Sequence, residues 1–262
     1  MTAHPQNTLA VVTGASAGIG YHLARICAES GHDLIIAAED DEIHVAADVF
    51  RREGHRVDAV QADLSTTDGV EQMLAAAQGR QIGLLLANAG CGMGGAFLDQ
   101  PLDGIRRTMA TNMTGTIHLL HRVVGEMRAA GQGRVLITGS IAGFVPGAYQ
   151  AVYNATKAFL DNFSFALRHE VKDQGITVTC LMPGATETDF FEKAGMMDTR
   201  IAQAPKSDPS DVARGGYDAM MRGDGDIVTG WLNKVQAAIM NVTPSGVLAA
   251  MQAKLSAPGS GR

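Results

Sequence analysis

The sequence contains no hydrophobic run long enough to cross a membrane. Its longest apolar stretches, such as residues 82–87, are far shorter than the ~20 residues that a membrane helix needs. The N-terminal MTAHPQNTL also lacks the basic region and apolar segment that mark a secretory signal. We therefore expect a soluble, cytoplasmic protein that has no membrane partner.

Clusters of positive charge are also missing. The chain holds 21 Lys and Arg against 27 Asp and Glu, which gives a formal net charge of −6. A protein that follows a nucleic-acid backbone needs a basic patch. The composition therefore argues against nucleic acid as a partner and favours a small-molecule ligand.

Cysteines and metal-ligand motifs are scarce. The three cysteines, Cys27, Cys91 and Cys180, show no paired spacing, so we expect reduced thiols and no disulfide. His118 and His121 lie three residues apart on a predicted helix, which places them on one face, but no third ligand follows. We therefore expect no metal site.

What the sequence does contain is a regular alternation of short apolar, β-branched runs with longer amphipathic stretches. Several of the amphipathic stretches end at a glycine, as helices commonly do, at Gly31, Gly54 and Gly175. The predicted strands are LAVVTG, DLIIAA, HRVDAVQA, IGLLLANAG, GRVLITGS, ITVTCLMPG and DIVTG. This alternation predicts an α/β fold: a Rossmann-type, doubly wound parallel sheet of about seven strands with helices on both faces.

The length of 262 residues and the lack of linker composition predict a single domain over residues 1–262. Asp208 as N-cap and Pro209 at the first helical position predict a helix start. The long connection over residues 185–208 suits an active-site flap, and a surface loop with a short helix is the alternative. Residues 231–262 form a C-terminal extension with a helical pattern and then a disordered end.

The stretch TGASAGIG, residues 13–20, joins a predicted strand to a predicted helix through three glycines. A helix N-terminus offers free N–H groups and the positive end of its dipole, so an anion such as a pyrophosphate is the natural ligand. Gly14 would form the tight turn, Gly18 would let the ligand approach, and Gly20 would let helix and strand pack closely. The spacing is not G-x-G-x-x-G, and the Lys-Ser/Thr of a nucleoside triphosphate loop is missing. A plain strand-to-helix turn is the alternative.

Polar residues follow the next three predicted strands. Glu39 and Asp40 come about 20 residues after the glycine turn, where an acidic residue binds the adenosine ribose of a dinucleotide. A carboxylate there accepts hydrogen bonds from the 2′-hydroxyl and repels a 2′-phosphate, although an acidic helix start is a second interpretation. The third and fourth strands end at the same sheet edge with Asp63, Leu64, Asn88, Ala89 and Gly90.

Tyr153 and Lys157 lie four residues apart, so on a helix they share a face. A neighbouring ammonium stabilises a phenolate and would lower the pKa of the tyrosine from about 10 toward neutrality, which makes it a usable acid and base. Ser140 ends the predicted strand GRVLITGS at the same sheet edge and would hydrogen-bond a substrate oxygen. Asn112 is an unusual polar residue within a long helical stretch.

In this order, TGxxxGxG, ANAG, Asn112, Ser140, YxxxK and the PG of residues 183–184 resemble the pattern of a short-chain dehydrogenase/reductase of the short, single-domain branch. The resemblance covers about residues 8–230. It implies that Tyr153 is the general acid/base, that Ser140 orients the carbonyl or alcohol, and that Lys157 binds the nicotinamide ribose and lowers the tyrosine pKa. It also implies that Asn112 holds a water in a proton relay.

The cofactor predicted from this resemblance is NAD(H), with NADP(H) as the alternative. Members that prefer NADP usually carry an arginine after the second strand or a basic residue before the second glycine, whereas this chain has Glu39, Asp40 and Ala17 there. The family's NAD-type aspartate aligns near Ala38, so Glu39 would substitute for it. The predicted cofactor-binding residues are Gly14, Ser16, Ala17, Gly18, Ile19, Gly20, Glu39, Asp63, Leu64, Asn88, Ala89, Gly90, Tyr153, Lys157, Pro183, Gly184, Thr186 and Thr188.

These features predict an NAD(H)-dependent oxidoreductase that interconverts a secondary alcohol or hydroxy compound and its ketone or aldehyde by hydride transfer. Two alternatives stay open: an NADPH-dependent ketoreductase of biosynthesis, and a non-catalytic dinucleotide-binding sensor on the same fold. The resemblance also predicts a homodimer or homotetramer.

The substrate pocket is expected between residues 90–97, residues 141–149 and the segment after Thr188. Tyr149 is a predicted polar contact, and Lys193 and Arg200 are placed to reach a carboxylate. Trp231 lies over the cleft or in a subunit contact, with ordinary helix packing as the alternative. The predicted apolar wall, which would otherwise fill the core beneath the flap, consists of Phe97, Phe144, Val145, Phe190, Phe191, Met196 and Met197.

Overall fold

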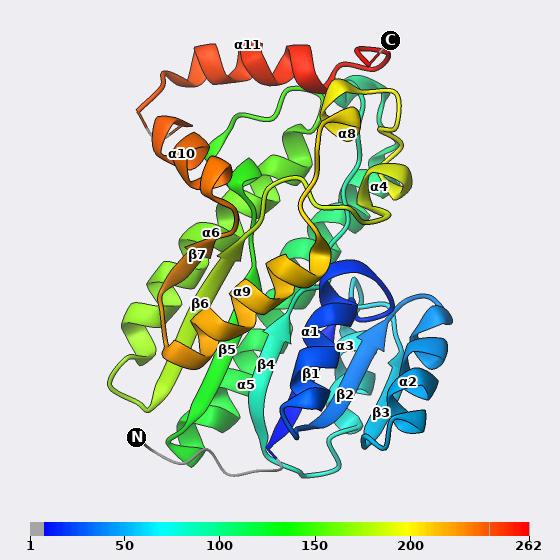
Figure 1. The fold of residues 1–262 in the computed structure, drawn as a ribbon, viewed down its shortest axis with the longest axis vertical. Coiled ribbons are helices and arrows are strands. Elements are labelled where there is room, and N and C mark those ends of the chain that lie inside the picture. The colour runs from blue at the N-terminus through cyan, green and yellow to red at the C-terminus, as the bar shows by residue number, and fades with distance from the viewer. Residues whose placement is uncertain (1–7, 241, 262) are drawn as a thin grey trace.

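The computed structural model describes residues 8–240 and 242–261 and centres on a parallel β-sheet (Figure 1). Its seven strands run in the order β3-β2-β1-β4-β5-β6-β7, and each neighbouring pair is parallel. The prediction of a Rossmann-type, doubly wound sheet is therefore confirmed. The strands are β1 (Leu9–Thr13), β2 (Asp33–Ala38), β3 (Val57–Gln61), β4 (Ile82–Ala87), β5 (Gly133–Thr138), β6 (Ile176–Met182) and β7 (Asp226–Val228).

The strands form where the sequence has unbroken runs of Val, Ile, Leu and Ala. All residues of β1, LAVVT, are buried, as are those of β2 after its first residue. A strand that is covered on both faces needs no polar alternation. Most of the predicted strands run one to three residues past the observed ends, because the polar residues that follow belong to loops at the carboxyl edge of the sheet.

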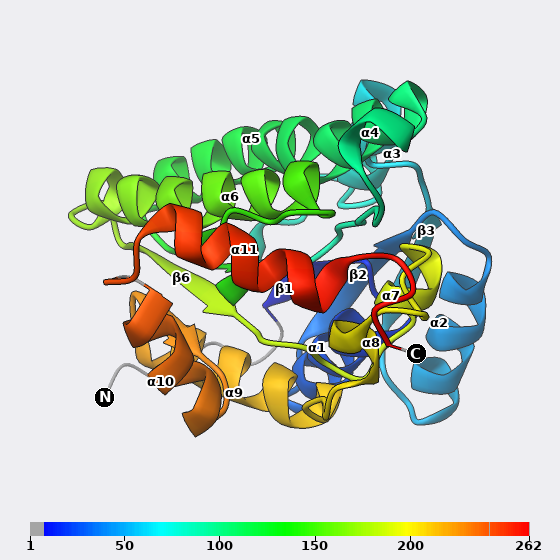
Figure 2. The same ribbon diagram turned by 90° about the horizontal axis from the view of Figure 1, so that it is seen from above.

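Helices cover both faces of the sheet (Figure 2). One face carries α1 (Gly18–Glu29), α2 (Glu42–Arg52) and α9 (Pro209–Arg222), and the other carries α3 (Thr67–Ala75), α5 (Thr116–Ala130) and α6 (Ala151–Val171). Successive strand residues point to opposite faces. Val12 and Ile36 accordingly pack in the core beneath α1, whereas Val11 and Ile35 pack in the core beneath α5.

The carboxyl edge of the sheet is the place where a ligand site is expected. β1 pairs with β2 on one side and with β4 on the other, so the connections after β1 and β4 run to opposite sides. Such a switch point leaves a crevice beyond the strand ends. The shorter elements are η1 (Phe97–Asp99), α4 (Leu102–Met109), a π-helical segment (Ala110–Gly115), η3 (Ile141–Phe144), α7 (Phe190–Lys193), α8 (Arg200–Gln203), α10 (Trp231–Met240) and α11 (Ser245–Ser256).

The segment of residues 185–208 folds over this edge rather than running as an open loop. Its two short helices, α7 and α8, enclose a small core of Phe191, Ala194, Met196 and Ala202. Its two ends are held together, since the N–H of Ser207 donates to the carbonyl of Ala185 at 2.9 Å. The helix α9 follows as predicted: it begins at Pro209, and Asp208 Oδ1 accepts the N–H of Ser210 at 2.7 Å.

The C-terminal end is ordered over residues 257–261, so the prediction of a disordered end was wrong there. The N–H of Gly259 donates to Asp198 Oδ2 at 2.6 Å, and Arg200 Nε donates to the carbonyl of Ser260 at 2.8 Å. The composition of this tail does not show such contacts, because its partners lie about 60 residues earlier in the chain. In the part of the chain that the structure describes, no helix is long and apolar enough to span a membrane.

Candidate active site

The glycine turn follows β1 and leads into α1. Gly14 and Gly18 have φ angles of 64° and 56°, a conformation that residues with side chains rarely adopt. Gly20 packs so closely on the turn that an added Cβ would overlap with the carbonyl of Gly14. The backbone geometry therefore requires glycine at all three positions, and the turn brings the N-terminus of α1 to the edge of a cavity.

The loop after β4 holds this turn in place. The N–H groups of Asn88 and Ala89 both donate to Thr13 Oγ1, at 3.0 and 2.9 Å. Asn88 Nδ2 donates to the carbonyl of Thr13 at 3.2 Å. A Cβ added to Gly14 would come within 2.9 Å of Ala89 Cα and fill the space between the two loops. The two loops thus form a glycine-dependent cradle at a helix N-terminus, which fits a pyrophosphate group.

The segment of residues 185–208, which we call the flap, lies against the other side of the cradle. Thr186 and Thr188 both line the cavity, and Thr186 Oγ1 donates to the carbonyl of Gly184 at 3.0 Å. A Cβ added to Gly18 would come within 2.8 Å of Thr188 Cγ2. The glycine turn and the start of the flap are therefore close neighbours, although 170 positions separate residues 18 and 188.

Two carboxylates from the loop after β2 line the same cavity, and each has a basic partner. Glu39 Oε2 accepts a hydrogen bond from Arg107 of α4, and this carboxylate raises the pKa of the arginine. Asp40 Oδ2 lies 3.5 Å from Lys193 Nζ of α7. Sequence reasoning missed Arg107, because only the fold brings it to a residue 68 positions earlier.

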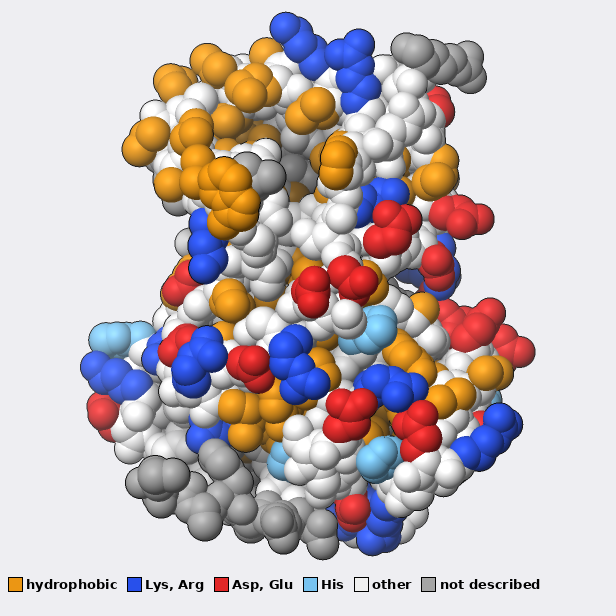
Figure 3. All heavy atoms as spheres, viewed as in Figure 1, with side chains coloured by type: hydrophobic (Ala, Val, Ile, Leu, Met, Phe, Trp, Pro, Cys, Tyr) orange, Lys and Arg blue, Asp and Glu red, His pale blue; other side chains and the backbone are white. Residues whose placement is uncertain are grey.

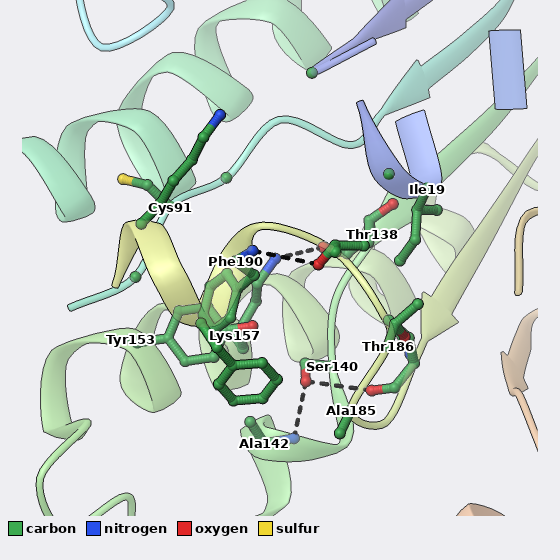
Figure 4. A pocket seen from close by; sticks show the side chains of 18 of the residues that line it. Ile19, Cys91, Thr138, Ser140, Ala142, Tyr153, Lys157, Ala185, Thr186 and Phe190 are labelled. Atoms are coloured by element: carbon green, nitrogen blue, oxygen red, sulfur yellow. Dashed lines mark hydrogen bonds between the residues drawn. The ribbon is translucent and has the colours of Figure 1, made fainter. Parts of the chain in front are cut away.

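Tyr153, Lys157 and Ser140 meet at one part of the cavity (Figure 4). Tyr153 and Lys157 lie one turn apart in α6, and Lys157 Nζ is 5.8 Å from the centre of the tyrosine ring. Ser140 follows β5, and its Oγ donates to the carbonyl of Pro183 at 3.3 Å and accepts the N–H of Ala142 at 3.1 Å. Lys157 Nζ donates to the carbonyl of Thr138 at 2.8 Å. A strand end and a helix thus bring a phenol, a hydroxyl and an ammonium together.

The protonation of this group differs from the expectation. Burial raises the pKa of Tyr153 to about 12, although the hydrogen bond with Ser140 opposes this rise. Burial also lowers the pKa of the Lys157 ammonium. The expectation that the lysine brings the tyrosine pKa below its usual value was therefore wrong for this structure, because burial is the largest influence on the phenol.

Asn112 lies in the π-helical segment, a type of turn that is frequent at functional sites. Its Oδ1 accepts the N–H of Cys91 at 2.9 Å, and its Nδ2 donates to the carbonyl of Cys91 and to Thr156 Oγ1, both at 2.9 Å. These bonds satisfy an amide that is fully buried. They also tie the loop after β4 to α6, which carries Tyr153.

Asp161, one turn after Lys157 in α6, is a second residue that sequence reasoning missed. Its Oδ1 accepts the N–H of Ser140 at 3.2 Å, and a Cβ added to Gly139 or Gly143 would overlap with its carboxylate. Burial raises the pKa of Asp161 to about 6, although the Ser140 N–H and the charge of Lys157 oppose this rise. The carboxylate therefore packs against the backbone that positions Ser140. The signal in the sequence is an acid four residues after the lysine on the same helix face.

One cavity of about 1210 Å³ joins these parts. This volume exceeds the ~300–1,000 Å³ typical of ligand pockets, so it has room for a dinucleotide and a substrate together. Of the residues predicted from the sequence as catalytic or cofactor-binding, Gly20 and Asn112 pack behind its surface. The others line it: Gly14, Ser16, Ala17, Gly18, Ile19, Glu39, Asp63, Leu64, Asn88, Ala89, Gly90, Ser140, Tyr153, Lys157, Pro183, Gly184, Thr186 and Thr188.

The predicted apolar wall is partly correct. Val145, Phe190 and Phe191 line the cavity. The ring of Phe190 packs on Tyr153 with 4.8 Å between the ring centres. A Cβ added to Gly92 would come within 2.8 Å of Phe190 Cε2, so this ring also closes on the loop after β4. The start of the flap therefore forms one wall beside the tyrosine.

The remaining predicted wall residues lie elsewhere. Phe97 and Met197 are 54 % and 56 % exposed, and Met196 is buried in the core of the flap. Phe144 lines a separate, smaller pocket, and Tyr149 lies outside the lining of the large cavity. Met196 thus follows the alternative, a core beneath the flap. The predictions for the other four residues were wrong, because an apolar or aromatic side chain on a loop fits a cavity, a core or the surface equally well until the fold is known.

The two basic residues predicted to reach a substrate carboxylate have other partners. Lys193 pairs with Asp40, and Arg200 binds the carbonyl of Ser260 in the C-terminal tail. Arg200 lies outside the lining of the cavity, whereas Lys193 lines it, so a role in binding a substrate carboxylate stays a prediction for Lys193 alone.

The C-terminal extension supplies a further part of the cavity lining. Residues of α10 and α11 line the cavity: Trp231, Asn233, Gln236, Met240, Gln252 and Leu255. The extension is anchored near Tyr153, since Gln252 Nε2 and Ser256 Oγ each donate to Gln150 Oε1 at 3.3 Å. Gln150 immediately precedes α6 and is buried. Trp231 therefore lies at the cleft, although 72 % of it is exposed.

The histidines and cysteines of the described chain form neither a metal-ion site nor a disulfide. His118 Nε2 lies 2.8 Å from Glu71 Oε1. Cys27 and Cys180 are buried free thiols, and Cys91 is a free thiol at the cavity. Within residues 8–240 and 242–261, no group of three or more His, Cys, Asp or Glu is placed to hold a metal ion.

Similar proteins share this arrangement of fold and sequence. An uncharacterized oxidoreductase of Myxococcus xanthus is 29% identical over 254 residues, which cover 94% of this chain and 96% of the relative. A short-chain dehydrogenase from Sphingobium yanoikuyae in complex with NADPH matches with a TM-score of 0.80 and 28% identity over 90% of this chain and 96% of that one. The bulky-bulky ketone specific alcohol dehydrogenase from Comamonas testosteroni matches with a TM-score of 0.77 and 28% identity over 91% and 96%.

The family follows from the extent of the sequence match. A family model described as short chain dehydrogenase matches residues 8–198, from the start of β1 to the middle of the flap. This range contains the glycine turn, the strand ends and the whole Ser140, Tyr153 and Lys157 group. On these grounds the chain belongs to the short-chain dehydrogenase family, as the resemblance predicted.

Proposed function

We propose that this protein is an NAD(H)-dependent oxidoreductase that interconverts a secondary alcohol, or a related hydroxy compound, and its carbonyl form. The observation that carries the proposal is the grouping of Tyr153, Ser140 and Lys157 in one cavity with the glycine turn. A phenol within hydrogen-bond reach of a hydroxyl is suited to pass a proton to a carbonyl oxygen. Membership of an oxidoreductase family supports the same reaction class.

Each residue of the group has a distinct role in this proposal. Tyr153 donates a proton to the substrate oxygen in reduction and removes it in oxidation. Ser140 orients that oxygen by a hydrogen bond. Lys157, whose Nζ lies 5.8 Å from the centre of the tyrosine ring, would supply positive charge that favours the phenolate during proton transfer. The amide of Asn112 hydrogen-bonds Cys91 in the loop after β4 and Thr156 in α6. Asn112 therefore supports a proton relay by holding this loop against α6.

The cofactor would bind along the carboxyl edge of the sheet. The glycine turn would hold its pyrophosphate, Glu39 its adenosine ribose, and Asp63 and Leu64 its adenine. The nicotinamide, which accepts or supplies the hydride when bound, would lie near Asn88–Gly90, Pro183, Gly184, Thr186 and Thr188. The cradle between the two glycine-bearing loops supports this placement.

Two carboxylates at the ribose end support NAD(H) over NADP(H). Glu39 and Asp40 line the cavity there, and like charges would repel a 2′-phosphate. Initial rates with NADH and NADPH at equal concentration test this preference. We expect faster turnover with NADH, and a marked preference for NADPH would contradict the assignment.

One observation favours the second candidate, an NADPH-dependent ketoreductase. Arg107 and Lys193 lie beside the same two carboxylates, and a guanidinium is a good partner for a phosphate. The Sphingobium relative was solved with NADPH. For this candidate, Arg107→Ala would slow turnover with NADPH far more than turnover with NADH. The reverse pattern, or an equal loss, would leave NAD(H) as the assignment.

The lining of the cavity beyond Tyr153 supports an apolar substrate. Val145, Phe190, Met240 and Leu255 contribute apolar surface there, and the two lysines Lys193 and Lys206 that also line the cavity lie 3.5 Å and 3.3 Å from the carboxylates of Asp40 and Glu187. The name of the Comamonas relative, a bulky-bulky ketone specific enzyme, favours ketones with two large substituents. A panel from small to bulky ketones, assayed with both cofactors, tests the proposal. Tight NADH binding without turnover of any member would favour a non-catalytic dinucleotide-binding protein.

A further inference from the structure

The C-terminal extension carries an unusual surface. Of the fifteen large hydrophobic side chains that are exposed in the described chain, seven lie within residues 231–255. In Figure 3, hydrophobic side chains gather over the part of the molecule where Figure 1 draws α10 and α11. We refer to the seven as the apolar patch: Trp231, Val235, Ile239, Val242, Val247, Met251 and Leu255.

Most of the patch faces solvent. In each helix its members recur at every fourth position, so each set forms one stripe along the helix. The buried residues of the same helices lie on other faces: Ala237 is across α10 from its stripe, and Leu248, Gln252 and Ser256 lie about 100° around α11 from its stripe. A surface helix of a soluble protein normally turns polar residues outward, and these two helices do the reverse. Such a contiguous apolar surface marks an interaction site.

The charges within the C-terminal extension itself have one sign. Residues 231–262 contain no Asp or Glu, although the whole chain has a net charge of −6. Lys234 and Lys254 are exposed and stand next to the patch residues Val235 and Leu255. Apolar stripes bordered by lysines, with a tryptophan at one end, are typical of helices that lie in the interface of an anionic bilayer.

A second copy of the chain fits the patch less well. In a two-fold dimer centred on the patch, apolar stripes would meet apolar stripes, and Lys234 and Lys254 would need acidic partners at the rim. Residues 231–262 supply no such acid, so the partners would have to come from outside the extension. Anionic headgroups, in contrast, match both the lysines and the apolar stripes.

The patch is continuous with the substrate end of the cavity. Trp231 and Leu255 belong to both, and Met240 and Gln252 of the same helices line the cavity. A bilayer against this face would bring acyl chains close to the apolar wall. The surface is therefore placed where an apolar substrate would enter.

We propose that α10 and α11 form a peripheral binding surface for anionic lipid bilayers. The apolar patch lies in the interface, and Lys234 and Lys254 contact lipid phosphates. This mode of binding needs no membrane-spanning helix. It revises the expectation of no membrane partner, which was based only on the lack of a long hydrophobic run.

The chain offers its own reporter for this proposal. Trp231 is its single tryptophan and lies in the patch, 72 % exposed. The full-length protein is titrated with vesicles of phosphatidylcholine alone, or with about one-third phosphatidylglycerol. We expect a blue shift of the tryptophan emission and co-sedimentation with the anionic vesicles. Both should weaken as salt is raised, because salt screens the lysines.

Two double variants separate the charged and apolar contributions. Lys234→Gln with Lys254→Gln should weaken binding to anionic vesicles roughly 30-fold, at ~1 kcal/mol for each lysine. Val235→Ser with Ile239→Ser should weaken binding to both kinds of vesicle by about tenfold or more. All four side chains are exposed, so the melting temperature should stay close to that of the wild type. Val45→Ser is the matched control, because Val45 is 67 % exposed on α2, away from the patch. This variant should bind vesicles like the wild type.

Two results would overturn the proposal. One is that the wild type fails to bind anionic vesicles at low salt, or that the patch variants bind as well as the wild type. The other is a dimer, seen by light scattering, that binds no vesicles and that the patch variants convert to monomers. The second result would assign the patch to another copy of the chain.

Discussion

The two ends of the cavity are built by different means. The cofactor end consists mainly of backbone: three glycines, the start of α1 and the N–H groups of residues 88 and 89 that bind Thr13. The substrate end consists of side chains from the flap and from α10 and α11. A backbone cradle accepts only glycine at a few positions, whereas an apolar wall accepts many residue types. The first end is therefore specified closely by its sequence, and the second is free to vary with the substrate.

Tyr153→Phe should give the largest difference between the two ends, because it should reduce turnover and leave cofactor binding intact. The ring and its packing on Phe190 remain, but the proton is lost. Turnover should fall by about 10²–10⁴-fold, the range of general acid–base catalysis, while the affinity for NADH stays unchanged. Steady-state rates and a fluorescence titration with NADH measure the two effects. Turnover within about tenfold of the wild type would remove Tyr153 from the chemistry.

Gly20→Val should damage the cofactor end alone. Its side chain would overlap with the carbonyl of Gly14, so we expect a loss of about 3 kcal/mol or more in the free energy of unfolding, together with weaker NADH binding. Chemical denaturation and NADH titration measure this. Gly125→Val in α5 is the matched control, because nothing lies within 4 Å of a Cβ there. Equal effects of the two substitutions would show that the cradle does not depend on close packing.

Asp161→Asn should change how stability depends on pH at the junction of the two ends. The pKa of Asp161 is raised from 3.8 to about 6, so the folded protein binds the proton more tightly than the unfolded chain. The free energy of unfolding should therefore fall by about 3 kcal/mol as the pH rises from about 4 to about 6. The Asn variant lacks this loss, so its stability relative to the wild type should increase over that window. Parallel pH profiles for the two proteins would contradict the burial argument.

Met240→Ala should have the smallest effect and should touch only the substrate end. Met240 lines the cavity from α10, and removing its apolar contact should raise the KM for a bulky ketone about fivefold. The KM for a small ketone and the affinity for NADH should not change. Met109→Ala is the control, since Met109 is 44 % exposed on α4 and lies outside the cavity lining. A uniform rise in KM for small and bulky ketones would place Met240 outside substrate recognition.

The contrast between a cradle made of backbone and a wall made of side chains also explains which features could be predicted from the sequence. The strands, the glycine turn and the start of α9 at Pro209 follow from local rules, since each requires particular residues at particular positions. The joint pattern of Ser140, Tyr153 and Lys157 identified the family for a similar reason. These signals are short in sequence or fixed by the spacing of a helix.

The missed features depend on contacts between distant parts of the chain. Arg107 meets Glu39 only in the fold, and the tail meets Asp198 only because α11 lies against α8 of the flap. Phe97 and Met197 resemble wall residues in sequence, but they are exposed. The pKa of Tyr153 was misjudged because spacing shows the nearby lysine and does not show the desolvation.

The central claim is hydride transfer between a nicotinamide and a carbonyl carbon, with the proton carried by Tyr153. The most direct test is the reduction of a ketone found in the panel, with a cofactor deuterated at both C4 positions. The account predicts a product that carries one deuterium on its carbinol carbon and a solvent proton on its oxygen. A product whose carbinol carbon carries only solvent hydrogen would contradict it.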